Sequence, residues 1–119
     1  MTYAKAYAEL SFAYQRGIAR GVWTASERQV DAKVAAERSL ELNPDLPEGI
    51  VAAAGIARDE LRFEDAENFL RRAISLAPGE ALPHSLYANL LYQLGRPAEA
   101  LESAKRAVAL DPLDISSRQ

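Results

Sequence analysis

The side chains of this chain that are able to do chemistry are mainly carboxylates and arginines, because its 119 residues include no cysteine and one histidine, His84. Thiolate nucleophiles, thiolate metal sites and disulfides are therefore excluded, and a single histidine cannot form a multi-histidine metal site. An acidic cluster resembles paired catalytic carboxylates and consists of Glu60, Glu64, Asp65 and Glu67. Arginines at helical spacing from it, at positions 58, 62 and 71, favour ion-paired, solvent-exposed helix faces instead.

Motifs that carry catalysis are also missing from the sequence. No glycine-rich phosphate loop is present, and no serine has a histidine and an acid around it in a recognisable order. We predict a turn at Gly79-Glu80. His84, near the start of a helix, is predicted to be a packing or surface residue. We therefore predict a protein that is not an enzyme, with no catalytic residue, cofactor or metal ligand.

Composition and charge restrict the partners further. Apolar residues make up 49% and charged residues 26% of the chain, the balance of an ordinary globular domain. The net charge of −3, with basic residues scattered among acids, predicts no nucleic-acid binding. No apolar run approaches the ~20 residues that cross a bilayer, and the first residues lack the pattern of a secretion signal. These features predict a cytoplasmic protein without a membrane partner.

A sequence repeat predicts the helices that carry these side chains. The same helix ending occurs three times at intervals of 34 residues, as RSLELNP at 38–44, RAISLAP at 72–78 and RAVALDP at 106–112. Such a period is typical of stacked supersecondary units that bury their apolar faces against one another. Proline excludes the helical conformation for the residue before it, so each helix ends there. We expect the leucine repeated in this ending, for example Leu76, to be buried.

Each repeat is predicted to hold two helices. The closing helix is amphipathic, with apolar residues three or four positions apart from Ala66 to Ala77. The opening helix is expected at Glu48–Glu60 in the second unit and at Pro83–Leu94 in the third. Gly95 can take the left-handed conformation that ends the opening helix of the third unit. In the second unit Leu61-Arg62-Phe63 must make the same turn without glycine.

The first unit is larger than the others. Alignment of its two halves indicates about nine inserted residues within Arg16–Ser26. Either the opening helix runs two turns longer or a loop protrudes, and Ser26 followed by Glu27 suits a helix start. Trp23 in this insertion either folds back to cap the first helix pair or anchors a partner.

The spacing resembles the tetratricopeptide repeat family, whose unit is 34 residues of helix, turn and helix. The resemblance rests on small residues and a proline at matching places: Ser11, Ala54 and Ala88; Ala32, Ala66 and Ala100; Ser39, Ala73 and Ala107; Pro44, Pro78 and Pro112. It implies an all-α superhelix (solenoid) of three helix-turn-helix units, the first with an enlarged segment between its helices. We expect one domain over 1–119, with units at about 3–46, 47–80 and 81–114 and a tail at 115–119.

The family resemblance implies a scaffold that binds a peptide or protein through the concave face of its opening helices. The residues expected to contact the partner are Phe12, Arg16, Val51, Arg58, Ser85, Asn89, Tyr92 and Gln93. Further residues expected on that face are Lys5, Ala8, Gln15, Glu48, Gly55, Asp59 and Leu82. A plain solvent-exposed face without a partner is the alternative. The family's clamp for chaperone tails is excluded, because apolar residues such as Ala8, Phe12 and Leu86 hold its places.

Two further readings remain open. The last helix lacks a following unit to cover it, so the chain is predicted to form a homo-oligomer through Leu101, Ala104 and Val108, unless it is part of a longer protein. The segment GRPAEALESAKRAVALDPLD at 95–114 is also similar to the repeat-bearing tail of bacterial regulatory proteins, where repeats follow a nucleotide-cyclase or winged-helix domain. That resemblance implies a regulatory segment of a larger signalling or transcription-regulatory protein.

Overall fold

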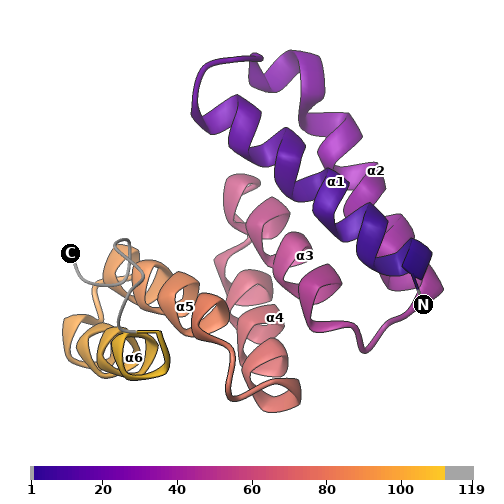
Figure 1. The fold of residues 1–119 in the computed structure, drawn as a ribbon. Helices are drawn as coiled ribbons and strands as arrows, with labels where there is room; N and C mark the ends of the chain where they lie inside the picture. The colour runs from indigo at the N-terminus through magenta and orange to yellow at the C-terminus, as the bar shows by residue number, and fades with distance from the viewer. Residues whose placement is uncertain (1, 112–119) are drawn as a thin grey trace.

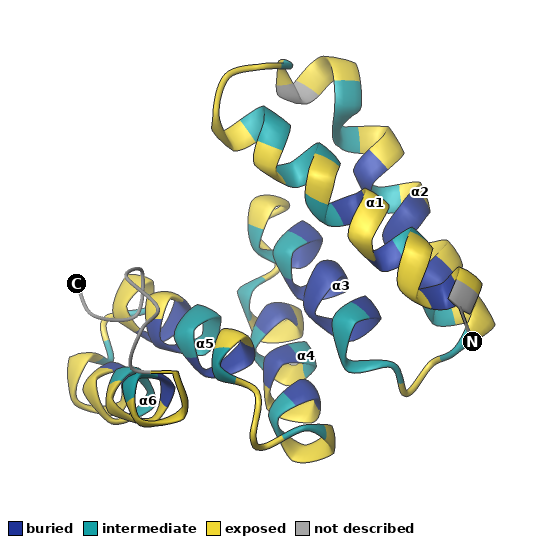
Figure 2. Cartoon of the chain, in the orientation of Figure 1, coloured by how far each residue is buried: buried dark blue, intermediate teal, exposed yellow. Residues whose placement is uncertain are grey.

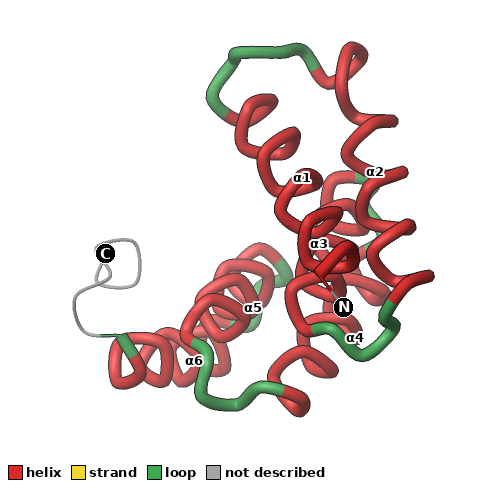
Figure 3. The backbone as a smooth tube through the Cα atoms, turned by 45° about the vertical axis from the view of Figure 1, so that its right-hand side comes forward, coloured by secondary structure: helices red, strands yellow, loops and turns green. Residues whose placement is uncertain are grey.

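The computed structural model describes residues 2–111 and shows six α-helices and no strand among them (Figures 1 and 3). The helices are α1 (Thr2–Ala19), α2 (Ala25–Leu42), α3 (Pro47–Asp59), α4 (Phe63–Leu76), α5 (Ala81–Gln93) and α6 (Pro97–Leu110). The proline at 112 and the tail at 115–119 lie outside the described residues. The observed helix α3 begins one residue earlier than the predicted opening helix of the second unit, and α5 begins two residues earlier than that of the third. Both helices end one residue earlier than predicted. The difference at α5 arises because a proline is tolerated throughout the first turn, where its missing amide hydrogen breaks no helical bond.

The helices pack in consecutive pairs that stack into a curved array. The pairs are α1 with α2, α3 with α4, and α5 with α6. Between pairs, α3 packs against both α1 and α2, and α5 packs against α4. The all-α superhelix of helix pairs is therefore confirmed.

Small residues at the predicted places allow the paired helices to approach closely. Figure 2 shows buried segments along the helices of each pair. Ala32, Ala66 and Ala73 are fully buried on helices that pack in these pairs. In the first unit, two buried serines stand at places where the other units have alanine, and each binds a backbone carbonyl of the partner helix. The Ser11 hydroxyl donates to the Ala32 carbonyl at 2.7 Å, and the Ser39 hydroxyl donates to the Ala4 carbonyl at 2.7 Å. Their polar atoms are thus satisfied inside the core.

The prediction that the repeated leucine is buried is wrong. Leu42, Leu76 and Leu110 are 43%, 44% and 38% exposed. The core face of α4 runs through Ala66, Leu70 and Ala73. With about 3.6 residues per turn, Leu76 lies at the edge of that face. It is therefore partly exposed, whereas Ala73 in the same ending is fully buried.

All three turns between paired helices have the same backbone geometry. The second residue after the helix takes a positive φ, which is 78° at Gly21, 63° at Leu61 and 77° at Gly95. The following amide donates to the carbonyl five residues earlier, as from Arg62 to Ala57 at 2.8 Å and from Arg96 to Leu91 at 2.9 Å. This is the Schellman helix ending, which favours glycine because a β-carbon is strained in the left-handed region.

Leu61 is therefore expected to be strained, and Leu61→Gly should raise the free energy of unfolding by about 0.5 to 1 kcal/mol. The side chain is 72% exposed, so its removal loses little packing. Urea denaturation of the variant tests this expectation, with Gly95→Leu as the matched opposite change. A Leu61→Gly protein less stable than the wild type would show that the leucine side chain contributes more than its backbone costs.

The inserted residues of the first unit lengthen both of its helices. Helix α1 continues to Ala19, and α2 begins at Ala25, so the insertion is mainly helical and the two-turn extension is shared between two helices. Thr24, rather than Ser26, caps α2, because the Thr24 hydroxyl accepts from the Glu27 amide at 3.2 Å and the Glu27 carboxylate accepts from the Thr24 amide. This capping box fixes where α2 starts.

Trp23 folds back onto the first helix pair, which is the packing alternative of the two interpretations. The centroids of the Trp23 and Tyr14 rings lie 5.7 Å apart. The Arg28 guanidinium carbon lies 5.3 Å from the centroid of the Trp23 ring. Trp23 also rests on the backbone of Gly17, where a β-carbon would lie 2.5 Å from the indole. The tryptophan therefore closes the extended end of α1 and α2 instead of being presented to a partner.

Candidate functional site

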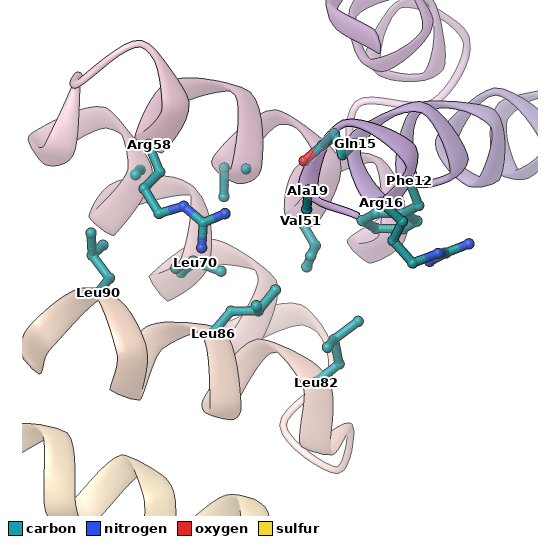
Figure 4. Close-up of a pocket in the computed structure, with 13 residues that line it drawn as sticks. Phe12, Gln15, Arg16, Ala19, Val51, Arg58, Leu70, Leu82, Leu86 and Leu90 are labelled. Atoms are coloured by element: carbon teal, nitrogen blue, oxygen red, sulfur yellow. The ribbon is translucent and has the colours of Figure 1, made fainter. Parts of the chain in front are cut away.

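A groove with a volume of about 300 Å³ opens on the side of the array formed by the opening helices (Figure 4). It lies between α3 and α5, is closed at one end by α1, and has α4 as its floor. Its lining consists of Phe12, Gln15, Arg16, Ala19, Val51, Ala54, Gly55, Arg58, Ala66, Leu70, Leu82, Leu86 and Leu90. The volume is at the lower end of the range of small-molecule and peptide-anchor pockets.

Apolar side chains form most of the groove surface. Leu82, Leu86 and Leu90 follow one another at four-residue spacing along α5, so they form one stripe that faces α3 (Figure 4). Leu82 is 50% exposed and Leu86 is half-buried, whereas Leu90 is buried. The stripe therefore descends from the solvent into the core, and its outer part offers apolar surface to a ligand.

The groove exists because α3 and α5 make few direct contacts, whereas α1 and α3 pack together. This difference in packing between the two pairs of opening helices corresponds to a difference in the size of the facing side chains. Ala52 is fully buried on the α1 side of α3, and Gly55 lets the Gln15 carboxamide approach α3 closely. Leu86 occupies in the third unit the place of Ala52 in the second, and its larger side chain fills space that would otherwise allow close packing.

Polar groups stand at the groove where it meets α1. The Gln15 amide nitrogen donates to the Ser11 hydroxyl at 3.0 Å and to the Ala52 carbonyl at 3.2 Å, so its orientation is fixed. Arg16 is exposed, and the Arg58 guanidinium lies 3.6 Å from the Asp59 carboxylate. Burial raises the pKa of the Asp59 carboxyl, and the neighbouring Arg58 opposes this effect.

The structure brings together half of the residues predicted to contact a partner. Phe12, Arg16, Val51 and Arg58 line the groove, as do Gln15, Gly55 and Leu82 of the wider set. The other four, on α5, do not line it: Ser85 is half-buried, and Asn89, Tyr92 and Gln93 are exposed. They form a stripe beside that of the leucines.

The other residues expected on the concave face do not line the groove. Ala8 is fully buried and has no surface to offer a ligand, so the expectation is wrong for it. Lys5, Glu48 and Asp59 lie outside the groove lining, and their place on the concave face stays a prediction. Sequence reasoning missed Leu90, Leu70 and Ala66. It assigned only the opening helices to the face, whereas Leu70 and Ala66 lie on α4. The four-residue spacing of leucines along α5 was the available signal for the stripe.

Three members of the acidic cluster are ion-paired, as predicted, whereas no ion pair of Glu64 occurs within residues 2–111. Glu67 differs from the prediction, because it does not lie on a solvent-exposed face. Glu60 pairs with Lys33 at 2.9 Å and with Arg62 at 2.7 Å, and Asp65 pairs with Arg62 at 2.9 Å. Glu67 is only 16% exposed and connects the second unit to the third. Its carboxylate accepts from the Tyr87 hydroxyl at 3.0 Å and from the Arg96 guanidinium at 3.0 Å.

The described residues contain no group of three or more histidines, aspartates and glutamates able to hold a metal ion. Within the same part of the chain, no helix is both long and apolar enough to span a membrane. His84 is buried, with its ring nitrogen 3.2 Å from the Pro78 carbonyl, and so has a packing role at the start of α5.

Comparison with known proteins gives one curated relative and several similar structures. The relative is the cellulose synthase operon protein C of Pseudomonas fluorescens (strain SBW25), which is 33% identical over 75 residues. The match covers 63% of this chain and 6% of that protein, so the chain spans a small part of its relative's length.

Two solved structures share the fold over nearly the whole chain. Pseudomonas aeruginosa pilF matches with a TM-score of 0.79 and 24% identity over 98% of this chain and 49% of that one. A mutant of the Thermobaculum terrenum O-GlcNAc transferase matches with a TM-score of 0.74 and 25% identity over 95% of this chain and 21% of that one.

A third structure, the first repeat domain of Spaghetti (RPAP3) bound to an HSP90 peptide, matches with a TM-score of 0.77 and 16% identity. The match covers 98% of this chain and 86% of the Spaghetti (RPAP3) chain. The family model described as tetratricopeptide repeat matches residues 57–118, more than half of the sequence. With its paired helices, small residues at the crossings and 34-residue period, the chain belongs to the tetratricopeptide repeat family.

Proposed function

We propose that this protein is a non-enzymatic scaffold that binds a peptide or protein segment in the groove between α3 and α5. The observation that carries the proposal is the leucine stripe of α5, whose outer part is exposed to solvent in a concave position. Apolar surface in a pre-formed groove favours binding of an apolar side chain, and the arginines at the rim offer charge-assisted hydrogen bonds. Members of the family generally mediate protein–protein interactions, in agreement with this role.

Chaperone tails are not the ligand that we propose. The Spaghetti (RPAP3) structure contains an HSP90 peptide, but its likeness to this chain extends to the fold alone. Of the places that such a clamp requires here, Ala8 and Ala52 are fully buried, and Leu82 and Leu86 offer no charge. An acidic tail would therefore meet apolar side chains.

Selection of a phage-displayed library of random 12-residue peptides on the purified protein tests the proposal. We expect enriched peptides with a recurring apolar residue, because the groove accepts one or two large side chains. Leu82→Glu should lower their affinity about tenfold or more, since a carboxylate then enters the apolar wall.

Val34→Glu is the control, because Val34 is similarly exposed but lies on α2 outside the groove. Circular dichroism confirms that each variant is folded. Equal loss of binding in both variants, or no loss in Leu82→Glu, would contradict the proposed site. The variants Asn89→Ala and Tyr92→Ala then test whether the adjoining stripe of α5 contributes to the same binding.

Self-association through α6 is a second candidate. Leu101 is 56% exposed, and Ala104 and Val108 are half-buried on the same helix. Repeat arrays bury such residues against another unit or another copy. If α6 forms this contact, light scattering will show an oligomer that Leu101→Glu converts into a monomer; a monomer before and after the change would exclude it.

A role within a larger bacterial protein is compatible with both candidates. The curated relative is bacterial and much longer than this chain, which supports the proposal that such a repeat segment works beside other domains. We propose a regulatory role for such a segment, with repeat units at about 3–46, 47–80 and 81–114.

A further inference from the structure

A second cavity, with a volume of about 320 Å³, lies where the enlarged first unit passes the end of α3. Ile18 and Ala19 line it from the last residues of α1, and Gln29 lines it from α2. In the period of the repeat, α3 and α5 end before the places that correspond to Ile18 and Ala19. The insertion therefore builds one wall of this cavity, and the shorter units have no equivalent of it.

This cavity adjoins the apolar groove, because Gln15, Ala19 and Arg58 line both. Its character is different, since its remaining lining includes Gln29, Asp59 and Glu60. A ligand with an apolar side chain in the groove can therefore place a polar side chain in the second cavity.

Gln29 is the central polar group of the cavity. It stands at the place that Phe63 occupies in the second unit, where the phenyl ring packs against the core. The Gln29 amide nitrogen is buried and has no hydrogen-bond partner within residues 2–111. Burial of an unpaired amide opposes folding, so a glutamine here indicates a use other than core packing.

The other groups of the cavity select the chemistry of its occupant. The charges of the cavity are already paired within the protein. Arg58 lies 3.6 Å from Asp59, and Glu60 pairs with Lys33 and Arg62, so neither a ligand carboxylate nor a ligand ammonium group meets an unpaired opposite charge. A carboxamide has a carbonyl that accepts from Arg58, or from Gln29 when its side chain turns into the cavity, and an amino group that donates to the Asp59 carboxylate. It satisfies donors and acceptors of the cavity without adding a charge.

We infer that the enlarged first unit adds a subsite to the groove that binds an asparagine or glutamine side chain of the ligand. This inference rests on the proposed function, because the ligand is held by its apolar side chain in the groove between α3 and α5. The insertion thereby sets specificity, while the leucine stripe supplies the anchor.

The test repeats the 12-residue phage selection on the wild type and on Gln29→Leu, with Asn68→Leu as the control. Asn68 is an exposed side-chain amide on α4 outside both cavities. Peptides selected by the wild type and by Asn68→Leu should carry asparagine or glutamine at a fixed distance from an apolar residue. Peptides selected by Gln29→Leu should keep the apolar residue and lose the amide preference.

Affinities of synthetic peptides measured by fluorescence anisotropy complete the test. Replacing the selected asparagine or glutamine by alanine should weaken binding to the wild type about tenfold and leave binding to Gln29→Leu nearly unchanged. Gln29→Leu should also unfold at the same or a higher temperature than the wild type, because it removes an unpaired buried amide.

The outcomes separate this inference from the proposed function. Peptides that share an apolar residue without an enriched amide, or the same amide preference in Gln29→Leu, would overturn the subsite and leave the groove intact. A marked loss of thermal stability in Gln29→Leu would overturn it as well, because the glutamine would then be a structural residue. No enrichment on any variant would overturn both proposals.

Discussion

Replacing Leu90 by alanine is expected to lower the free energy of unfolding by about 2 to 5 kcal/mol, the cost of deleting a buried leucine side chain and leaving a cavity. Leu90 is 1% exposed and packs against Ala54, Ala57, Ala66 and Leu70 in the core that joins the second and third units. A small domain has about 5 to 15 kcal/mol of stability in total, so this change removes a large part of it. Urea denaturation followed by circular dichroism measures the effect.

Leu76→Ala is the matched control, because it deletes the same side chain at a half-exposed site that the repeat marks as equivalent in every unit. Its expected cost is below about 1 kcal/mol, since much of the side chain is already in contact with water. A larger loss in Leu76→Ala than in Leu90→Ala would contradict the placement of the core. The comparison thus separates residues that recur in the sequence from residues that stabilise the fold.

Glu67→Gln is expected to lower the free energy of unfolding at neutral pH by about 1 to 3 kcal/mol, the usual value of a hydrogen bond to a charged group. The variant weakens the bond from Arg96 and alters the one from Tyr87, both of which join the second unit to the third. Glu64→Gln is the control, because Glu64 is exposed on the same helix and no ion pair involves it within the described residues. Thermal unfolding of the three proteins at pH 7 measures the difference.

The same carboxylate predicts a dependence on acid. The hydrogen bond from the Arg96 guanidinium holds the pKa of Glu67 below its usual value, and the Tyr87 hydroxyl acts in the same direction. Because the folded-state pKa is lower than the unfolded-state pKa, this contribution is fully present above the unfolded-state value and is lost as the pH falls through the folded-state value. The gap in stability between the wild type and Glu67→Gln should therefore shrink on acidification, and a gap that stays constant down to acidic pH would contradict the role of the charge.

The polar network around Glu67 has a second consequence for the groove. The second and third units are joined by packing of α4 against α5 and by the Glu67 network, while α3 and α5 make few contacts. The width of the groove is therefore set by contacts on the opposite side of α5. Changes at Glu67 are expected to act on binding through the position of α5 and without touching a ligand.

Much of the architecture could be predicted from the sequence, because the repeated residues act locally. Proline ends the last helix of each unit, and Gly95 ends an opening helix. Alanine at Ala66 allows close packing with one neighbouring helix. The 34-residue period then required stacked helix pairs. The boundaries of the opening helices in the second and third units followed to within two residues, and Leu61-Arg62-Phe63 was expected to make the turn without glycine.

The candidate site was predicted less completely, because it depends on how closely separate units approach. Phe12, Arg16, Val51 and Arg58 were found from the expected face of the opening helices. Leu90 and Leu70 were missed, since their place in the groove follows from the separation of α3 and α5. Burial of Leu76 was wrongly expected because recurrence was equated with packing, although a residue at the end of a helix can recur while facing solvent.

The sequence by itself determined the helix pairs, their order and the family, since these follow from local conformational preferences repeated at a fixed period. Only the tertiary structure decided where the array opens, which side chains line the opening and how the insertion is used. Those features depend on contacts between residues far apart in the chain, such as Gln15 with Ala52 and Glu67 with Arg96. The free energy of such contacts depends on distance and burial, which no local pattern encodes.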